Sequence, residues 1–280
     1  MTVPVSVLMP ARNARSTVVA AVRSTLRALS PSDELLVLDD ASTDDTAALL
    51  ERIRDRRLGI VRTDVGLGVA QGLNRLLHEA RSPLVARMDA DDLALPLRFR
   101  LQRAVMGGRD LAFGNILPFG QRRARISASS LVALGQRDLS VWWLLENPTA
   151  HSAMIARRAS LLEVGGYRDM PTEDWDLWLR MATAGMSVWR GAVPVTAYRL
   201  HAGQVSTSAV YRTAIESDAR LASSWRGLLD ALGYSGAADA SFQDRLRRGS
   251  PVHEWLTEQA AELRADRRFV LARRLVAVAR

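Results

Sequence analysis

Near its start the chain carries the almost continuous apolar run VPVSVLM, Val3 to Met9, which is typical of a β-strand buried on both faces. Residues Ser16 to Leu29 follow with apolar side chains at helical spacing. The alternation of strand and helix patterns continues through Glu34 to Leu38, Thr43 to Arg54, Gly59 to Arg62, Val69 to Ala80 and Leu84 to Met88. This order predicts an α/β fold with a mostly parallel sheet and helices on both of its faces.

Polar side chains follow three of these predicted strands. The first strand runs into Pro10 to Asn13, the second into Asp39 to Asp44, and the fourth into Asp89 to Asp92. Ligands of parallel α/β sheets bind beyond the carboxyl ends of the strands, which share one edge. The sequence therefore predicts a binding site built from these three clusters.

The remainder of the chain is less regular. From about Ser208 the pattern is helical to the end, so we expect residues 1–207 to form one domain and residues 208–280 a helical extension. In the middle region, between the alternating strands and helices of the N-terminal part and the helical extension, the predicted strands are Leu111 to Phe113, His151 to Ala156, Ser187 to Arg190 and Val195 to Leu200.

Composition narrows the chemistry that the chain can perform. Its 280 residues are 48% hydrophobic, enough for a sizeable core, and neither a membrane-spanning apolar run nor a signal-peptide pattern is present. We therefore expect a cytoplasmic protein. The chain has no cysteine, and all 38 of its basic residues are arginine, which excludes cysteine nucleophiles, thiolate metal sites and Schiff-base lysines. The net charge of +8 suggests an anionic partner, although we expect no binding of nucleic acid.

The triplet Asp89-Ala-Asp91 is the most informative acidic motif. Two carboxylates one residue apart at a strand end can share a divalent cation and the diphosphate that the cation binds, and oxygen ligands suit Mg²⁺ or Mn²⁺. The alternative is a solvated acidic loop. Asp39 and Asp40 can accept hydrogen bonds from a nucleoside, or they can begin a turn that leads into the next helix.

The segment PTEDWDLWLR, Pro171 to Arg180, places three carboxylates at the start of an apolar, tryptophan-rich helix. One interpretation is structural, because Thr172 can cap the helix while Glu173 and Asp174 complement the positive end of its dipole. That interpretation alone leaves open why acids stand at the start of a buried element.

Two further patterns are weaker. The glycines of Gly66 to Gly72 imitate a dinucleotide-binding fingerprint, but they follow the third predicted strand and the last glycine is one position late. We interpret them as a tight loop before the helix that starts near Val69. Taken singly, His151, His201 and His253 are typical of surface or core residues.

Seven segments, taken in order, give the chain a resemblance to family 2 glycosyltransferases, which have the Rossmann-like GT-A fold and use nucleotide-sugar donors. The segments are SVLMPARN (Ser6 to Asn13), LDDASTDDT (Leu38 to Thr46), GLGVAQGLN (Gly66 to Asn74), MDADD (Met88 to Asp92), HSAMIARRASLLEVGGY (His151 to Tyr167), TEDWDLWLR (Thr172 to Arg180) and YRLHAGQVS (Tyr198 to Ser206). The resemblance implies that residues 1–110 form the nucleotide-sugar-binding half of a catalytic domain and residues 111–207 the acceptor half.

The resemblance also implies a chemical role for the acids in PTEDWDLWLR. Asp174 would be the general base that deprotonates an acceptor hydroxyl, in a single displacement with inversion, and Glu173 would orient the acceptor. We expect the helix dipole to favour the ionised form of Asp174. Trp175 and Trp178 would serve as packing residues or as an apolar platform for the acceptor sugar, and Asp176 would be structural.

For the donor, the resemblance implies a UDP- or dTDP-sugar bound by Pro10, Arg12, Asp40 and Asp89. Asp40 would contact the nucleobase and Asp89 the ribose. Arg12 departs from the family pattern, because an aromatic residue usually stands at its position. Either its guanidinium stacks on the base or the base is held in another way.

The resemblance further implies that Asp91 binds Mn²⁺ or Mg²⁺ at the diphosphate and that His201 completes the metal site. The acceptor would be a glycan or glycolipid of the cell envelope. Two other functions compete with this interpretation. One is a sugar-1-phosphate nucleotidyltransferase, although the chain lacks the glycine-rich N-terminal loop and the lysine of that class. The other is an inactive relative that only binds nucleotide or membrane.

The helical extension carries an apolar stripe next to arginines. Two interpretations fit it: peripheral association with the inner face of an anionic membrane, or packing on the catalytic domain. The stripe consists of Leu256, Ala260, Leu263, Val270 and Leu271.

Overall fold

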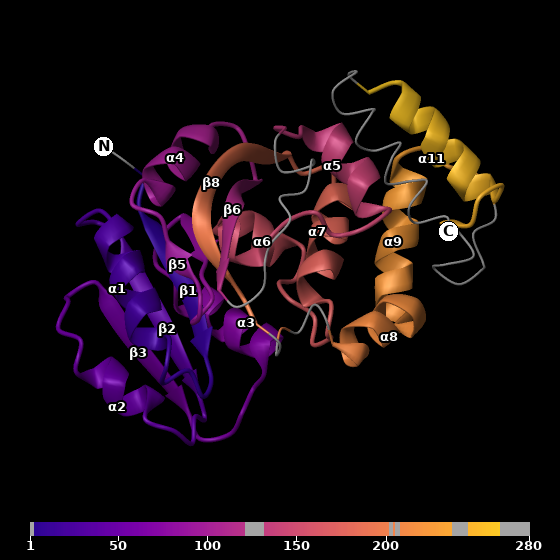
Figure 1. The fold of residues 1–280 in the computed structure, drawn as a ribbon. Coiled ribbons are helices and arrows are strands. Elements are labelled where there is room, and N and C mark those ends of the chain that lie inside the picture. The colour runs from indigo at the N-terminus through magenta and orange to yellow at the C-terminus, as the bar shows by residue number, and fades with distance from the viewer. Residues whose placement is uncertain (1–2, 121–131, 202–203, 205–207, 237–245, 264–280) are drawn as a thin grey trace.

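The computed structural model describes residues 3–120, 132–201, 204, 208–236 and 246–263. Its centre is an eight-stranded sheet with the strand order β3-β2-β1-β4-β7-β6-β8-β5 (Figure 1). The strands are β1 (Val5–Ala11), β2 (Glu34–Asp40), β3 (Leu58–Thr63), β4 (Leu84–Arg87), β5 (Leu93–Ala94), β6 (Leu111–Gly120), β7 (Met154–Arg157) and β8 (Val188–Leu200).

The first half of the sheet is parallel, as predicted. β2 and β4 both pair in parallel with β1, and β3 pairs in parallel with β2. Beyond β4 the sheet is mixed, because β7 runs antiparallel to both β4 and β6, and β8 runs parallel to β6 but antiparallel to β5. The carboxyl ends of β1, β2 and β4 therefore lie together at one edge.

Helices cover both faces of the sheet and enclose two apolar cores (Figure 1). Successive side chains of a strand point to opposite faces, so Leu8 lies in one core while Val7 and Met9 lie in the other. The helices are α1 (Val18–Ala28), α2 (Thr46–Glu51), α3 (Val69–Glu79), α4 (Arg98–Val105), α5 (Gln136–Trp143), α6 (Arg158–Glu163), α7 (Glu173–Thr183), α8 (Ala209–Ser217), α9 (Ala219–Ala231) and α11 (Pro251–Ala261), with a short 3-10 helix η2 (His151–Ala153).

Two predicted strand boundaries were wrong. The strand predicted from His151 begins only at Met154, because His151–Ala153 form the buried turn η2. The segments predicted as separate strands, Ser187 to Arg190 and Val195 to Leu200, belong to the single strand β8. β8 remains one strand because it stays paired with β6 across a register shift.

The C-terminal helices α9 and α11 pack on the same core as α7. Trp225 of α9 is buried, and its indole Nε1 donates to the carbonyl of Leu144 at 2.9 Å. In the predicted apolar stripe Leu256, Ala260 and Leu263 are at most 8% exposed. The packing interpretation is therefore right for these three residues; Val270 and Leu271 lie outside the described residues.

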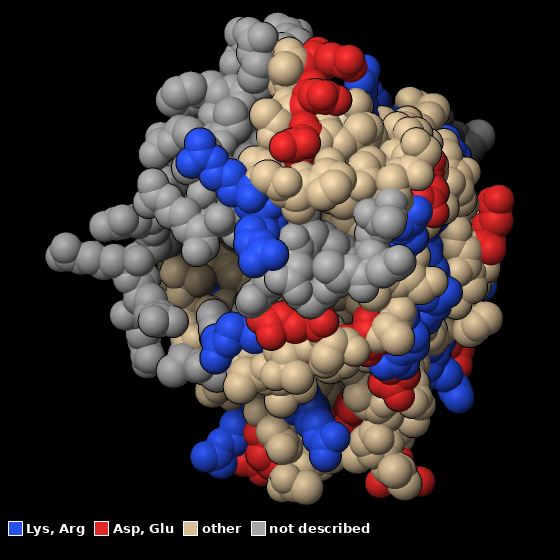
Figure 2. Space-filling model, turned by 90° about the vertical axis from the view of Figure 1, so that its right-hand side faces the viewer, with Lys and Arg blue, Asp and Glu red and all other residues tan. Residues whose placement is uncertain are grey.

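The surface over these helices carries mixed charge. Figure 2 shows both acidic and basic side chains on this face. None of the helices in the described part of the chain is long and apolar enough to cross a bilayer.

Candidate active site

The loops after β1 and β2 are joined to each other at the sheet edge. The side-chain oxygen of Asn13 accepts from the backbone N–H of Thr43 at 2.9 Å, and the backbone N–H of Asn13 donates to Ser42 Oγ at 2.9 Å. Asn13 and Ala41 both have positive φ, +50° and +51°. Non-glycine residues rarely adopt this conformation, and such strained positions cluster at functional sites.

Asp40 ends β2 and anchors the glycine-rich loop. Its carboxylate accepts from the backbone N–H groups of Leu67 at 2.6 Å and Gly68 at 3.0 Å, directly before α3. The predicted tight loop in front of this helix is thereby confirmed. Arg12 Nη1 lies 4.0 Å from Asp40 Oδ2, and a Cβ added to Gly66 would lie 2.3 Å from the same nitrogen. The half-exposed guanidinium of Arg12 therefore rests against Gly66, beside Asp40.

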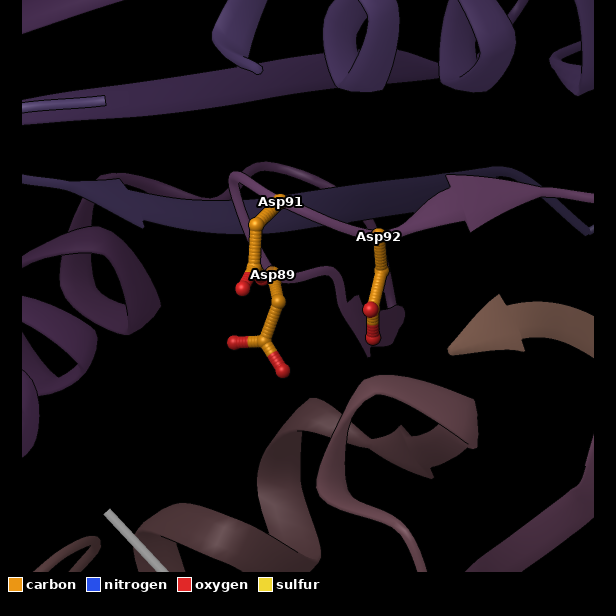
Figure 3. Close-up of side chains that lie close together, drawn as sticks. All are labelled: Asp89, Asp91 and Asp92. Carbon is orange, nitrogen blue, oxygen red and sulfur yellow. The ribbon is translucent and has the colours of Figure 1, made fainter. Parts of the chain in front are cut away.

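Three carboxylates gather after β4. Asp89, Asp91 and Asp92 each offer an oxygen, and these atoms lie within 4.8 Å of one another (Figure 3). Asp92, which the sequence analysis gave no role, is buried, and its Oδ1 accepts from the backbone N–H of Arg199 at 2.7 Å. Burial, followed by the nearby charge of Asp89, raises the pKa of Asp92 to about 7.

The cluster suits a hard divalent cation. Its donors are carboxylate oxygens, which Mg²⁺ and Mn²⁺ prefer. The end of β8 brings His201 to the same place, where its Nε2 lies 3.0 Å from Asp91 Oδ2. The structure thus brings together Asp91 and His201, the two residues predicted to bind metal.

A buried arginine lies beside these acids. Arg87, the last residue of β4, forms an ion pair with Asp89. Under it, the fully buried Arg98 donates to the carbonyl of Arg87 at 2.6 Å and to Thr196 Oγ1 at 2.9 Å. Arg87 was not among the predicted site residues, although it is a charged residue that closes the otherwise apolar strand LVAR.

The paired acids begin α7. Asp174 Oδ1 accepts from the backbone N–H of Trp175 at 2.6 Å, and Oδ2 accepts from Asn147 Nδ2 at 2.9 Å. Thr172 occupies the N-cap position, but its buried hydroxyl makes no hydrogen bond within the described structure, so the predicted side-chain cap was wrong.

The expected effect of the helix dipole on Asp174 is outweighed by burial. Burial, and then the neighbouring charge of Glu173, raise the pKa of Asp174 to about 6. Burial raises the pKa of Glu173 to about 7. Removing two adjacent carboxylates from water disfavours their charged forms more strongly than one helix N-terminus favours them.

Behind the paired acids lies a buried histidine. His151 Nδ1 is 3.7 Å from Glu173 Oε1, and His151 Nε2 is 2.9 Å from the hydroxyl of Tyr167. Burial and the charge of Arg87 lower the pKa of His151 to about 3, so the imidazole is neutral at physiological pH. His151 therefore lies beside Glu173 as a neutral group whose hydrogen bond is to Tyr167.

Trp175 does not face an acceptor. It is buried, and its Nε1 donates to the carbonyl of Trp143 at 2.9 Å. Trp178 is fully buried as well. Of the two predicted roles the packing role is right, because neither ring has a face available to a sugar. Asp176 is structural as predicted, since it is buried and lies 2.8 Å from Arg180 Nε.

A parallel half-sheet that ends in acidic clusters, next to a helix that begins with paired acids, defines a glycosyltransferase of the GT-A class. The chain belongs to glycosyl transferase family 2, whose model matches residues 6–166. The predicted family, fold and enzyme class are thereby confirmed.

Two curated relatives are similar over most of their length. UDP-Glc:alpha-D-GlcNAc-diphosphoundecaprenol beta-1,3-glucosyltransferase WfaP of Escherichia coli is 26% identical over 205 residues, which cover 73% of this chain and 80% of that protein. EpsE of Bacillus subtilis (strain 168) is 30% identical over 201 residues, covering 65% and 67% of the two chains.

Among solved structures, S. aureus TarS 1-349 in complex with UDP-GlcNAc matches with a TM-score of 0.67. The match covers 99% of this chain and 82% of TarS at 14% sequence identity. At this identity the similarity establishes the fold.

Proposed function

We propose that this enzyme transfers a sugar, with inversion, from a UDP- or dTDP-sugar to a hydroxyl of a glycan or lipid-linked glycan in cell-envelope polysaccharide synthesis. In this proposal residues 1–207 are the catalytic domain, with a donor half (1–110) and an acceptor half (111–207). The name of WfaP, which specifies a UDP-sugar donor and a diphosphoundecaprenol acceptor, supports this choice of substrates. The acceptor's membrane anchor would bring the enzyme to a bilayer peripherally.

The observation that carries the proposal is that Arg87 interacts with acids of both halves of the site, with Asp89 on one side and with Glu173 and Asp174 on the other. On the donor side Arg87 is paired with Asp89. On the acceptor side the charge of Arg87 opposes the burial-driven rise in the pKa of both Glu173 and Asp174. Acids for a donor diphosphate and acids for proton transfer therefore share one buried cation.

Asp174 acts as the general base in this proposal. With a pKa near 6, its carboxylate is mostly ionised at neutral pH and close enough to neutrality to accept a proton efficiently. It takes the proton of the acceptor hydroxyl while the hydroxyl oxygen bonds to the anomeric carbon. The bond from that carbon to the diphosphate oxygen breaks on the opposite face, so the configuration inverts. Glu173 holds the acceptor.

The donor lies along the strand ends. Pro10 lies near the end of β1, Arg12 follows that strand, Asp40 closes β2, and Asp89 comes shortly after β4. In this proposal Arg12 would stack on the nucleobase, which the position of its guanidinium against Gly66 and beside Asp40 supports. Asp89 would accept a hydrogen bond from the ribose.

Asp91 and His201, with the neighbouring carboxylates of Asp89 and Asp92, would hold Mn²⁺ or Mg²⁺. When bound, the ion would supply positive charge for the departing diphosphate. We expect Asp91→Ala to abolish Mn²⁺ binding, measured calorimetrically without substrate, and to abolish transfer. Normal Mn²⁺ binding and turnover in Asp91→Ala would contradict the metal assignment.

The substrates are tested by supplying the wild-type enzyme with a panel of UDP- and dTDP-sugars and a synthetic lipid-diphosphate GlcNAc acceptor. We expect release of nucleoside diphosphate and a product whose new linkage has the opposite anomeric configuration to the donor. Retention of configuration would contradict the single displacement. Formation of nucleotide sugar from nucleoside triphosphate and sugar 1-phosphate would identify a nucleotidyltransferase, and donor binding without turnover an inactive relative.

A further inference from the structure

The segment between α5 and η2 holds one amide side chain in a single orientation. Asn147 Oδ1 accepts from both the backbone N–H of Thr149 at 3.2 Å and the hydroxyl of Thr149 at 2.6 Å. A backbone N–H can only donate, so the amide oxygen of Asn147 must face Thr149. The amide NH₂ group therefore faces Asp174, whose Oδ2 lies 2.9 Å from Nδ2.

Thr149 is itself fixed by the end of α5. Its side chain is buried, and its hydroxyl lies 3.4 Å from Trp143 Nε1, a group that can only donate. Each hydrogen bond in this series has one possible direction, from the indole to the hydroxyl, from the hydroxyl to the amide oxygen, and from the amide nitrogen to the carboxylate. The series ends at Asp174 and holds the Asn147 amide in one orientation, with its oxygen towards Thr149 and its nitrogen towards Asp174.

The carboxylate of Asp174 is thus held at both oxygens. Trp175 donates its backbone N–H to Oδ1 from within α7, and Asn147 donates to Oδ2 from a different segment. Two donors at two oxygens fix the plane of the group, and each oxygen keeps a lone pair for a substrate proton.

The other ionisable and charged groups around Asp174 come from four elements. Glu173 of the same helix disfavours its ionised form, whereas Arg87 of β4 favours that form. His151 of η2 is neutral at physiological pH and adds no charge. Tyr211 of α8 faces the same acids, and burial raises its pKa, so its hydroxyl is neutral. Burial and the charge of Glu173 both disfavour the ionised carboxylate of Asp174. The hydrogen bond that Asn147 donates stabilises this ionised form.

We propose that Asn147 is a positioning residue for glycosyl transfer, which holds the Asp174 carboxylate in the orientation that receives the acceptor's proton. The inference rests on the proposed role of Asp174 as the general base.

The test compares Asn147→Ala, Asn147→Asp and wild type for transfer rate, donor dissociation constant, melting temperature and pH profile. We expect Asn147→Ala to lower kcat by roughly 10- to 100-fold, the usual scale for a group that orients a reacting one, with donor affinity within about twofold of wild type. In the pH profile of kcat/KM, the acidic limb of Asn147→Ala should lie at higher pH than that of wild type, because the ionised carboxylate of Asp174 has lost a hydrogen-bond donor. Asn147→Asp should move the limb further, since a second carboxylate then faces Asp174.

Gln259→Ala is the matched control. Like Asn147, Gln259 accepts a hydrogen bond at its amide oxygen, from Arg137 Nη2 at 3.1 Å, but it lies on α11 and has no part in the proposed site. It should behave as wild type. An unchanged acidic limb in Asn147→Ala would overturn the inference, as would a loss of rate that follows only a lower melting temperature. If Asp174→Asn abolishes transfer while Asn147→Ala behaves as wild type, the inference fails and the proposed base stands. If Asp174→Asn transfers normally, the proposed function fails first.

Discussion

Arg87 and Asp89, two residues apart at the end of β4, form an ion pair inside the candidate active site. Arg87 is buried, so removing it would leave the carboxylate of Asp89 next to Asp91 and Asp92 without compensation. Placing like charges together in a partly desolvated site is costly unless a cation accompanies them. The arginine therefore allows a cluster of acids to exist within a folded domain.

We expect Arg87→Met to lower the free energy of unfolding by about 3 kcal/mol, the scale for breaking a buried ion pair by removal of one partner. Denaturant unfolding of the two proteins at pH 7 measures the difference. Arg75→Met is the control, because Arg75 forms an exposed pair with Glu79, four residues further along α3, and such pairs contribute about 0.3–0.5 kcal/mol. Equal effects of the two substitutions would show that Arg87 is not compensating the cluster.

Asp174→Asn separates catalysis from support of the helix. The amide keeps the size of the carboxylate but cannot take a proton at neutral pH, so we expect turnover to fall by roughly 10²- to 10⁴-fold. Donor affinity should stay near wild type, because the donor residues lie on β1, β2 and β4. Asp176→Asn, two residues further along α7, should instead lower the melting temperature, since Asp176 is paired with Arg168 and Arg180. Unchanged transfer by Asp174→Asn would remove its proposed role.

Glu173 should make stability depend on pH in the direction opposite to that of an ordinary surface acid. Its pKa is raised to about 7 in the folded state from a reference value of 4.5, so the folded state binds more protons between these pH values. The contribution of Glu173 to stability therefore falls as pH rises from about 4.5 to 7. We expect Glu173→Gln to raise the melting temperature at pH 8 and to lose this gain towards pH 5. A difference in melting temperature that does not change with pH would contradict the raised pKa.

Two glycines of one loop should respond differently to alanine. In Gly66→Ala the new Cβ meets only the end of the flexible Arg12 side chain, so we expect weaker donor binding and an unchanged melting temperature. Gly68 has φ of +80° and no neighbour within 4 Å of an added Cβ, so Gly68→Ala should cost about 1 kcal/mol of stability through backbone strain. Calorimetric donor titration and thermal unfolding of both variants measure these effects. Equal donor affinities in wild type and Gly66→Ala would remove Arg12 from the donor site.

The sequence by itself determined the parallel half of the sheet and the place of its acids. Strand and helix patterns depend on local spacing, and a polar cluster that follows an apolar run marks a strand end wherever the rest of the chain lies. The same reasoning located Asp40 and Asp91 at one edge, because parallel strands end together, whereas the role expected of Asp174 came from the family resemblance. It could not predict that His201, 110 residues after Asp91 in the chain, would meet it without the family resemblance.

Tertiary packing decided the environment of each site residue. Trp175 became a core residue because α5 covers it, and Arg87 became a buried counter-ion because the sheet encloses the end of β4. The same packing outweighs the expected effect of the helix dipole on the pKa of Asp174, since desolvation depends on every neighbour, whereas the dipole depends only on position in the helix. The contact between Asn147 and Asp174 joins segments 27 residues apart, so only the folded chain could bring an amide to the proposed base.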